Sequence, residues 1–302
     1  MTLRTSIKED HSLLLSVIIP TCRRNKALTA CLQRLAPKNQ TLSGSQYEVI
    51  VTDDGAGGEA SAETLIRDSF PWVHWGAGPR RGPAANRNAG AAHARGKWIV
   101  FTDDDCLPAP SWLKAFADAV DAGDESQHVF EGRTTCAAGL THPLEDAPVN
   151  LSGGYLWSCN MAIRHDIFKE IGGFDEDFPL AHMEDADLRE RLKQRGIPFY
   201  FVEEAVVDHP PKRYSWRSAF GPYAESEIMY LYKHGQPGPH AARLLRQILH
   251  FRISWLLRAA RTPQALLPIT VISAREIFYI LLRAASWDRK YGTRFPPPTS
   301  PL

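Results

Sequence analysis

The stretch that decides the fold is Lys97-Trp98-Ile99-Val100-Phe101-Thr102-Asp103-Asp104-Asp105-Cys106. Four consecutive residues in it are aromatic or β-branched, which predicts a strand buried on both faces of a sheet. Three adjacent carboxylates follow, and at the end of a buried strand they would repel one another and lose hydration. A hard divalent cation, Mn²⁺ or Mg²⁺, relieves that repulsion because it takes oxygen ligands and commonly brings phosphate oxygens with it. The alternative is that the acids favour the start of the next helix. That helix is expected only from Ser111, after Pro108 and Pro110.

Composition places the chain among ordinary soluble globular proteins. It has 302 residues, of which 44% are hydrophobic and 23% charged, and its net charge of +1 gives no field that would attract nucleic acid. The five cysteines are scattered and lack a C-x-x-C pair, which argues against a disulfide framework and a zinc site. A reducing, cytoplasmic location is therefore expected. The apolar run at 13–19 reads as a first strand, and we expect no helix that spans a membrane.

Strand and helix patterns alternate along the first two thirds of the chain. Strands are expected at 13–19, 47–51, 72–75, 98–101, 128–132, 155–163 and 198–202. Helices are expected at 26–36, 61–69, 84–94, 112–120, 166–171 and 183–195. This alternation predicts an α/β fold with a doubly wound, mostly parallel sheet, since parallel neighbours need crossover connections. We expect a catalytic domain over 1–212 and a helical C-terminal region over 213–302.

Five stretches together resemble the family 2 glycosyltransferases of GT-A fold. They are residues 16–21 (SVIIPT), 51–55 (VTDDG), 85–90 (ANRNAG), 101–105 (FTDDD), and 172–176 (GGFDE) with 182–188 (HMEDADL). Each stretch is weak alone, but their order and spacing across residues 13–210 are specific to the family. The Q-x-x-R-W signature of processive synthases does not occur in the sequence, so the resemblance implies an enzyme that transfers a single sugar.

By this resemblance, the ends of the first two strands line a nucleobase pocket, where a carboxylate accepts a hydrogen bond from a ring N–H. The residues implied on the nucleotide-sugar side are Pro20, Thr21, Arg23, Asp53, Asp54, Arg87, Asn88, Asp103 and Asp104. From the residues alone, the segment 53–55 (DDG) could equally be a turn after a strand. Cys22 stands where the family usually has an aromatic residue, which leaves the stacking contact to the base unassigned.

The resemblance also implies a metal site. The first acid of the family's D-x-D signature contacts the ribose and the last holds the cation, which maps to Asp103 and Asp105. With three aspartates in a row, Asp104 is a rival ligand. His209 follows the last expected strand, where a histidine completes the metal site in some family members, and imidazole suits Mn²⁺ better than Mg²⁺. A structural role for this histidine is the alternative. The candidate metal ligands are therefore Asp105, Asp103 and His209.

Catalysis is implied for the acids at the start of the helix expected at 183–195. Asp185 matches the general base that takes the proton of the acceptor hydroxyl, and Glu184 would orient the acceptor or the base. The alternative is ordinary acidic decoration of a helix N-terminus. On the acceptor side the resemblance implies Trp157, Asn160 and Gly173, and Trp157 could stack on a sugar or fill the core.

We therefore predict a metal-dependent, inverting glycosyltransferase that works in cell-envelope polysaccharide synthesis. It would move one sugar from a nucleotide-diphospho sugar to a hydroxyl of a glycan or lipid-linked glycan. The alternatives are a nucleotidyltransferase acting on sugar phosphates and a non-catalytic sugar-binding protein of the same fold. The first of these normally has a Gly-rich, basic loop after the first strand, and the sequence at 20–23 (PTCR) is not such a loop.

The segment 240–290 is basic and amphipathic, with nine Lys or Arg against Glu276 and Asp288. Two apolar stripes at helical spacing run through it: Leu244, Ile248, Phe251 and Trp255, and then Ile269, Ile277, Ile280 and Leu281. Such helices can bind the inner face of the cell membrane as a peripheral anchor. They can equally pack on the catalytic domain or on a second copy in a homodimer.

Overall fold

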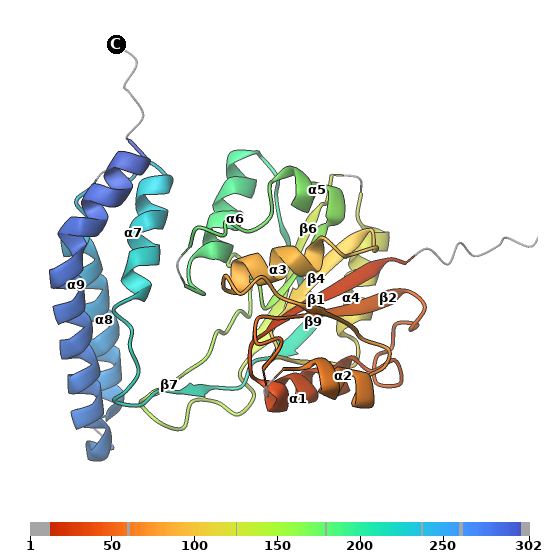
Figure 1. Cartoon of the computed structure of the whole chain (residues 1–302), viewed down its shortest axis with the longest axis horizontal. Coiled ribbons are helices and arrows are strands. Elements are labelled where there is room, and N and C mark those ends of the chain that lie inside the picture. Colours follow the sequence, from red (N-terminus) through yellow and green to blue (C-terminus); the bar gives the residue numbers. More distant parts are fainter. Residues whose placement is uncertain are drawn as a thin grey trace, which may run out of the picture.

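The structure is a computed structural model that describes residues 13–58, 61–124, 126–178, 180–236, 238–259 and 262–296. Its centre is an eight-stranded sheet with the strand order β3-β2-β1-β4-β8-β6-β9-β5. Helices cover both faces of this sheet, and three further helices stand together at one end of the molecule (Figure 1).

The first half of the sheet is parallel. It consists of β1 (Leu15–Thr21), β2 (Tyr47–Asp53), β3 (His74–Ala77) and β4 (Trp98–Thr102). Every residue of β1, β2 and β4 is buried, which explains their continuous apolar runs. The crossover helices are α1 (Asn25–Leu35), α2 (Glu63–Ser69) and α3 (Pro83–Ala91). The predicted α/β class and mostly parallel sheet are confirmed.

The strand direction reverses beyond β4. The next strand, β8 (Asn160–Arg164), is antiparallel to β4, and β6 (Val129–Thr135) is antiparallel to β8. Next to β6 lies the parallel β9 (Tyr200–Asp208), and β5 (Leu107–Pro108) pairs with β9 at the edge. The strand expected at 155–163 begins only at 160, because Gly153, Gly154 and Leu156 all have positive φ.

Helices pack over both faces of the sheet and bury a hydrophobic core cluster on each side. One core cluster lies under α1, α2 and α4 (Trp112–Ala122). The other lies under α3, α5 (His165–Glu170) and α6 (Glu184–Gln194). Each fully buried Leu or Phe in these layers contributes about 1.5–3 kcal/mol. A small second sheet joins β7 (Glu145–Asp146) to β10 (Lys212–Arg213).

The C-terminal region is helical, as expected from the sequence. It comprises α7 (Tyr223–Lys233), α8 (Ala241–Ala259), the short 3-10 helix η1 (Pro263–Ala265) and α9 (Leu266–Arg294). These helices have apolar cores of their own, which include Ile228, Trp255, Ile269 and Ile280. The predicted division of the chain after residue 212 stays a prediction. In contrast to the sequence-based expectation, the segment Pro263–Arg294 is long and apolar enough to cross a membrane, judged by length and composition alone.

One buried carboxylate joins this helical region to the sheet domain. Asp187 on α6 accepts hydrogen bonds from Lys233 (2.6 Å) and His234 (3.0 Å) at the end of α7. Its second oxygen accepts a hydrogen bond from Arg191 at 2.8 Å. The start of α6, where the predicted catalytic acids lie, is therefore held by the end of α7 in the C-terminal region.

Candidate active site

The candidate site lies at the carboxyl ends of β1, β2 and β4. Neighbouring parallel strands end at the same edge of a sheet, which is where ligands bind in open α/β folds. The Thr21 hydroxyl at the end of β1 donates to Asp104 after β4 at 2.7 Å. The Asp54 backbone N–H after β2 donates to the Thr21 carbonyl at 2.9 Å. The ends of the three strands are thus tied into one acidic surface.

The three consecutive aspartates have three different environments. Asp104 is buried, and its carboxylate binds Thr21 and the Arg24 guanidinium, which is 2.8 Å away. Burial raises the pKa of Asp104 to about 7, although Thr21 and Arg24 act in the opposite direction. Asp103 accepts a hydrogen bond from Arg87 at 2.6 Å. Asp105 pairs with Arg24 and faces His209. Two arginines therefore relieve the repulsion that the sequence predicts.

A candidate metal group lies at the third aspartate. Ligand atoms of Asp105, Cys106 and His209 lie within 4.8 Å of one another, and His209 Nε2 is 3.6 Å from Asp105 Oδ1. Cys106 is buried and burial raises the pKa of its thiol well above its usual value, so it stays protonated. The carboxylate and the imidazole then form a donor set that fits Mn²⁺ once phosphate oxygens complete it. Among the three aspartates, the geometry favours Asp105 as the ligand.

Arg24 is a site residue that sequence reasoning missed. Its guanidinium binds Asp104 and Asp105 together, and burial, which lowers its pKa, is outweighed by these carboxylates. It borders a cleft of about 520 Å³ that is also lined by Arg23, Lys26 and Asp105. The only signal in the sequence is its position three residues after Thr21. Its cationic side chain occupies the face of Asp105 that opens to this cleft.

Arg87 connects the two acidic groups of the site. It lies on α3, is 4% exposed, and donates to Asp103 at 2.6 Å and to Glu184 at 3.0 Å. Glu184 and Arg87 are 97 residues apart in the sequence. The acids after β4 and the acids at the start of α6 therefore lie within reach of one guanidinium.

Glu184 and Asp185, the first two acids of α6, are destabilised as anions. Burial and the neighbouring Asp185 raise the pKa of Glu184 to about 7, against the opposing effect of Arg87. One Glu184 oxygen is buried without a hydrogen-bond partner among the described residues. Burial also raises the pKa of Asp185, whose carboxylate accepts a hydrogen bond from the Ala186 backbone at 2.7 Å. The preceding Met183 has the left-handed φ of 76°, a costly conformation that fixes the start of α6.

An aromatic pair lies on the loop beside Asp185. Tyr155 and Trp157 have ring centroids 4.6 Å apart at an angle of 32°, and Tyr155 is 46% exposed. The buried carboxylate of Glu131 holds this loop by accepting from the Tyr155 N–H at 3.1 Å and the Leu156 N–H at 2.8 Å. The backbone next to Trp157 also hydrogen-bonds Asp185. Trp157 is half-buried and packs against the core cluster under α1, α2 and α4, so its stacking on a sugar stays a prediction.

Four other residues predicted on the nucleotide side lie at or after the ends of β1 and β2. Pro20 and Thr21 are buried in β1, while Arg23 is exposed with φ 57° and packs over Gly55. The Asp54 carboxylate accepts from the backbone N–H groups of Arg80 (2.8 Å) and Gly82 (3.1 Å). These positions border the site, and their contacts to a nucleobase stay predictions.

Two predicted nucleotide ligands, Asp53 and Asn88, make structural hydrogen bonds. Asp53 is fully buried and accepts hydrogen bonds from Gly55 (2.7 Å) and Ala62 (2.8 Å), so it shapes the turn after β2. The Asn88 amide exchanges hydrogen bonds with the Phe174 backbone, at 2.8 Å and 2.9 Å. Both side chains use polar atoms inside the protein, and their contact to a nucleotide stays a prediction.

Two residues predicted on the acceptor side, Asn160 and Gly173, have structural roles, and their part in acceptor binding stays a prediction. Asn160 is buried, accepts from Trp112 at 2.8 Å and donates to the backbone carbonyls of Arg133 and Ala205. Gly173 is buried with φ +67°, and a Cβ there would lie 2.7 Å from Asn88 Oδ1. Asn160 therefore joins strands, and Gly173 permits a tight turn.

The sheet order and the acidic site at its carboxyl edge define a protein of the GT-A class. The TarS 1–349 structure from S. aureus shares this fold at 15% identity, with a TM-score of 0.53 over 92% of both chains. The same fragment in complex with UDP gives 16% identity, a TM-score of 0.53 and the same coverage. Residues 16–172 match the sequence model of the family described as "Glycosyl transferase family 2". The chain therefore belongs to that family.

Curated relatives are consistent with this membership. Validoxylamine A glucosyltransferase of Streptomyces hygroscopicus subsp. limoneus is 28% identical over 250 residues, covering 68% of this chain and 53% of the relative. Pre-mycofactocin glycosyltransferase of Mycobacterium tuberculosis is 30% identical over 228 residues, covering 68% of this chain and 45% of the relative. The chain thus spans about half the length of these two relatives.

Proposed function

We propose that the protein is an inverting glycosyltransferase that moves one sugar from a nucleotide-diphospho sugar to an acceptor hydroxyl. The observation that carries this proposal is the Arg87 bridge, because it joins Asp103 on the donor side to Glu184 beside the proposed base. Such a transfer needs a diphosphate site and a carboxylate base on opposite sides of one sugar carbon. Membership in the family favours this reaction over the nucleotidyltransferase and the non-catalytic alternative.

On the donor side, Asp105 and His209 would hold Mn²⁺ or Mg²⁺, whose role when bound is to neutralise the charge of the departing diphosphate. Arg24 and Arg23 line the adjoining cleft and are suited to diphosphate oxygens, since planar guanidinium groups pair well with phosphate. Asp103 would contact the ribose, and Asp54 would lie near the base. The TarS complex with UDP makes a uridine diphosphate sugar the first donor to test.

On the acceptor side, Asp185 takes the proton of the attacking hydroxyl as the oxygen bonds to the anomeric carbon. The bond from this carbon to the diphosphate breaks in the same displacement, so the configuration inverts. Burial raises the pKa of Asp185 and makes its carboxylate a stronger base. Glu184, held by Arg87, positions this group. Tyr155 and Trp157 would stack on the acceptor, a glycan or lipid-linked glycan. The enzyme would act in the cytoplasm, in the synthesis of cell-envelope polysaccharide.

The test compares isosteric variants in two assays. Thermal shift with UDP, GDP, CDP and dTDP sugars, with and without Mn²⁺, reports donor binding, and release of nucleoside diphosphate reports transfer. Asp105→Asn is expected to abolish the Mn²⁺-dependent part of the shift. Asp185→Asn is expected to keep the shift and lose transfer by about 10²–10⁴-fold. Glu190→Gln removes a charge from the same helix and should leave both readouts unchanged. Normal transfer by Asp185→Asn would refute the proposed base.

A further inference from the structure

The two long C-terminal helices carry an apolar face that nothing in the described structure covers. The buried residues of α9 recur at helical spacing, with Ile269, Ile272, Ile280 and Trp287 facing the other helices. A second apolar series runs along the opposite side of the same helix. Six side chains of α8 and α9 are 57–73% exposed: Leu249, Leu257, Leu267, Phe278, Leu281 and Leu282. Clustered exposure of this extent marks a surface that binds something.

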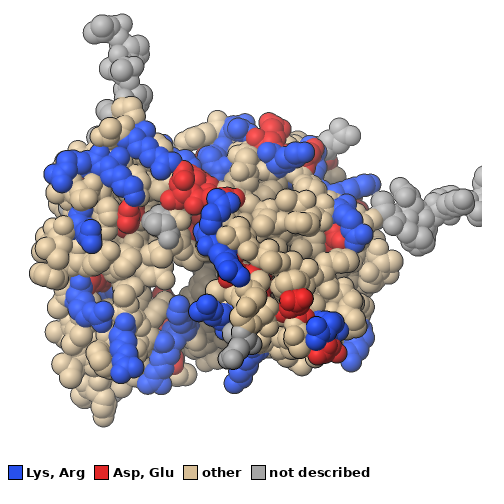
Figure 2. All heavy atoms as spheres, viewed as in Figure 1, with Lys and Arg blue, Asp and Glu red and all other residues tan. Residues whose placement is uncertain are grey.

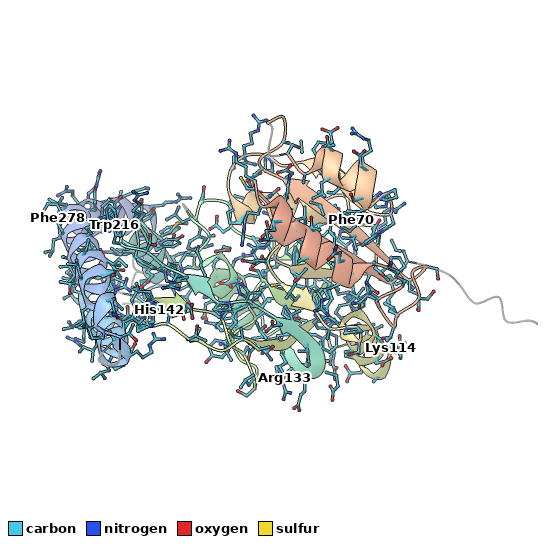
Figure 3. The ribbon with its side chains drawn as sticks, turned by 90° about the horizontal axis from the view of Figure 1, so that it is seen from below. Phe70, Lys114, Arg133, His142, Trp216 and Phe278 are labelled. Carbon is cyan, nitrogen blue, oxygen red and sulfur yellow. The ribbon has the colours of Figure 1, made fainter. Side chains whose placement is uncertain are left out.

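The exposed apolar residues form continuous stripes. On α9, Leu267, Ala274, Phe278 and Leu281 follow one another at steps of seven, four and three residues, which places them on one face. On α8, steps of four and three residues run through Leu249, Ile253 and Leu256. Figure 3 shows Phe278 at the outer end of the molecule, away from the sheet domain, with Trp216 close to it in the view. The face therefore points away from the active site.

The charged groups around this face are of one sign. Among the described residues of α8 and α9, each exposed charged side chain is basic, including Arg243, Arg246, Arg275, Arg283 and Arg289. The two acids are turned inward, since Glu276 is buried against Arg252 at 2.6 Å and Asp288 accepts a hydrogen bond from Tyr232 at 3.0 Å. Figure 2 shows blue side chains spread over this end of the molecule with few red ones between them. The face is both apolar and cationic.

Trp216 adds an interfacial anchor to this surface. It is 55% exposed, and its carbonyl accepts a hydrogen bond from Arg275 of α9 at 2.9 Å, so its loop is fixed to the helix. Tryptophan is enriched where a hydrocarbon layer meets water, because its ring is apolar and its N–H is polar.

We propose that the outer face of α8 and α9 docks on a membrane surface rich in anionic lipids, with both helices lying in the plane of the headgroups. The leucines and Phe278 enter the acyl boundary while the arginines meet lipid phosphates. A second copy fits less well, because two identical cationic faces would repel each other. Passage of α9 through the bilayer would take the buried Arg252–Glu276 pair apart, together with the packing of α9 on α7 and α8. This inference does not depend on the catalytic assignment.

The experiment is flotation of the full chain with vesicles of phosphatidylcholine alone or of phosphatidylcholine mixed with phosphatidylglycerol. Wild-type protein is expected to float with the mixed vesicles, to stay at the bottom with neutral ones, and to dissociate as salt rises. Replacing Arg246, Arg275 and Arg289 by Gln should weaken binding by about fivefold for each arginine, roughly a hundredfold in all. The matched control replaces three exposed cations of the sheet domain, Lys38, Arg67 and Lys114, and should float like wild type.

A second variant, Leu267→Ser with Phe278→Ser and Leu281→Ser, tests the apolar part and should remove flotation. Wild-type protein that stays at the bottom with the mixed vesicles would overturn the proposal. So would a triple-arginine variant that floats as well as the control. Sedimentation velocity adds one further outcome: a dimer that the serine variant dissociates, with no vesicle binding, would assign the face to a second copy and refute membrane docking.

Discussion

Replacing Asp187 by Asn tests the link between the sheet domain and the C-terminal helices. The carboxylate is fully buried and faces three cationic or protonatable groups: Arg191, Lys233 and His234. Burial alone would raise the pKa of Asp187. The hydrogen bond from His234 and the charges of Arg191 and Lys233 outweigh burial and lower the pKa to about 2. The variant keeps the shape of the side chain and removes its charge.

The magnitude follows from this pKa. Its ordinary value is 3.8, so folding lowers it by about two units, which corresponds to about 2 kcal/mol of stability near pH 7. Because the folded-state pKa is lowered, this contribution is fully present above the ordinary pKa and disappears as the pH falls through the folded value. The variant should therefore lose about 2 kcal/mol near pH 7, roughly half of that near pH 3, and nothing below about pH 2.

The assay is urea unfolding followed by tryptophan fluorescence at several pH values, with the free energy of unfolding compared between variant and wild type. Asp118→Asn is the control, because its ion pair with Lys114 is exposed and should contribute less than about 1 kcal/mol. A variant as stable as wild type near pH 7 would refute the reasoning. A loss of stability that does not shrink toward pH 3 would refute the electrostatic explanation.

Three further predictions concern the site. Gly173→Ala should destabilise the protein by about 1–3 kcal/mol in thermal melts, because φ is +67° and the new Cβ would lie 2.7 Å from Asn88 Oδ1; an unchanged melt would contradict this. Glu131→Gln should raise KM for the acceptor and leave nucleotide binding intact, because Glu131 holds the loop at 154–156; a weaker thermal shift by donor would argue against it. Arg24→Ala should tighten Mn²⁺ binding without nucleotide several-fold in electron paramagnetic resonance, because Arg24 competes for Asp105; weaker binding would show the opposite role.

Sequence patterns predicted the first half of the fold well because its strands are buried on both faces. The apolar runs in β1, β2 and β4 are continuous because both faces of each strand are buried. Such runs stand out in the sequence, so the positions of these strands were predicted to within a few residues. The end of β9 was missed because Glu203 and Glu204 break its apolar pattern. Both are exposed, and the pairing with β6 resumes after an irregularity at Gly132 and Arg133. A local pattern carries no information on such long-range pairing.

The location of the acidic residues in the candidate site could be predicted from the sequence. The contacts of the asparagines and arginines could be predicted less well. Acids at strand ends have few structural uses, so the clusters at Asp103–Asp105 and Glu184–Asp185 stood out. Asn88 and Asn160 matched or neighboured family motifs, yet both serve backbone groups inside the fold. Arg87 was expected to border the nucleotide, and its bond to Glu184 depends on a contact across 97 residues. Pairing of this kind is fixed by the tertiary fold and leaves no trace in a local sequence pattern.

The reversal of strand direction after β4 separates the segments that carry the proposed donor site from the segment that carries the proposed acceptor loop. Apart from His209, the residues proposed to hold the cation and the nucleotide come from positions before about 106, whereas the Tyr155 loop comes from the antiparallel half that begins at β6. Residues 126–178 are thus a natural cassette to exchange between homologues when engineering acceptor choice. The donor half would keep its own strands and crossovers, and the seam to match is the register of β8 against β4.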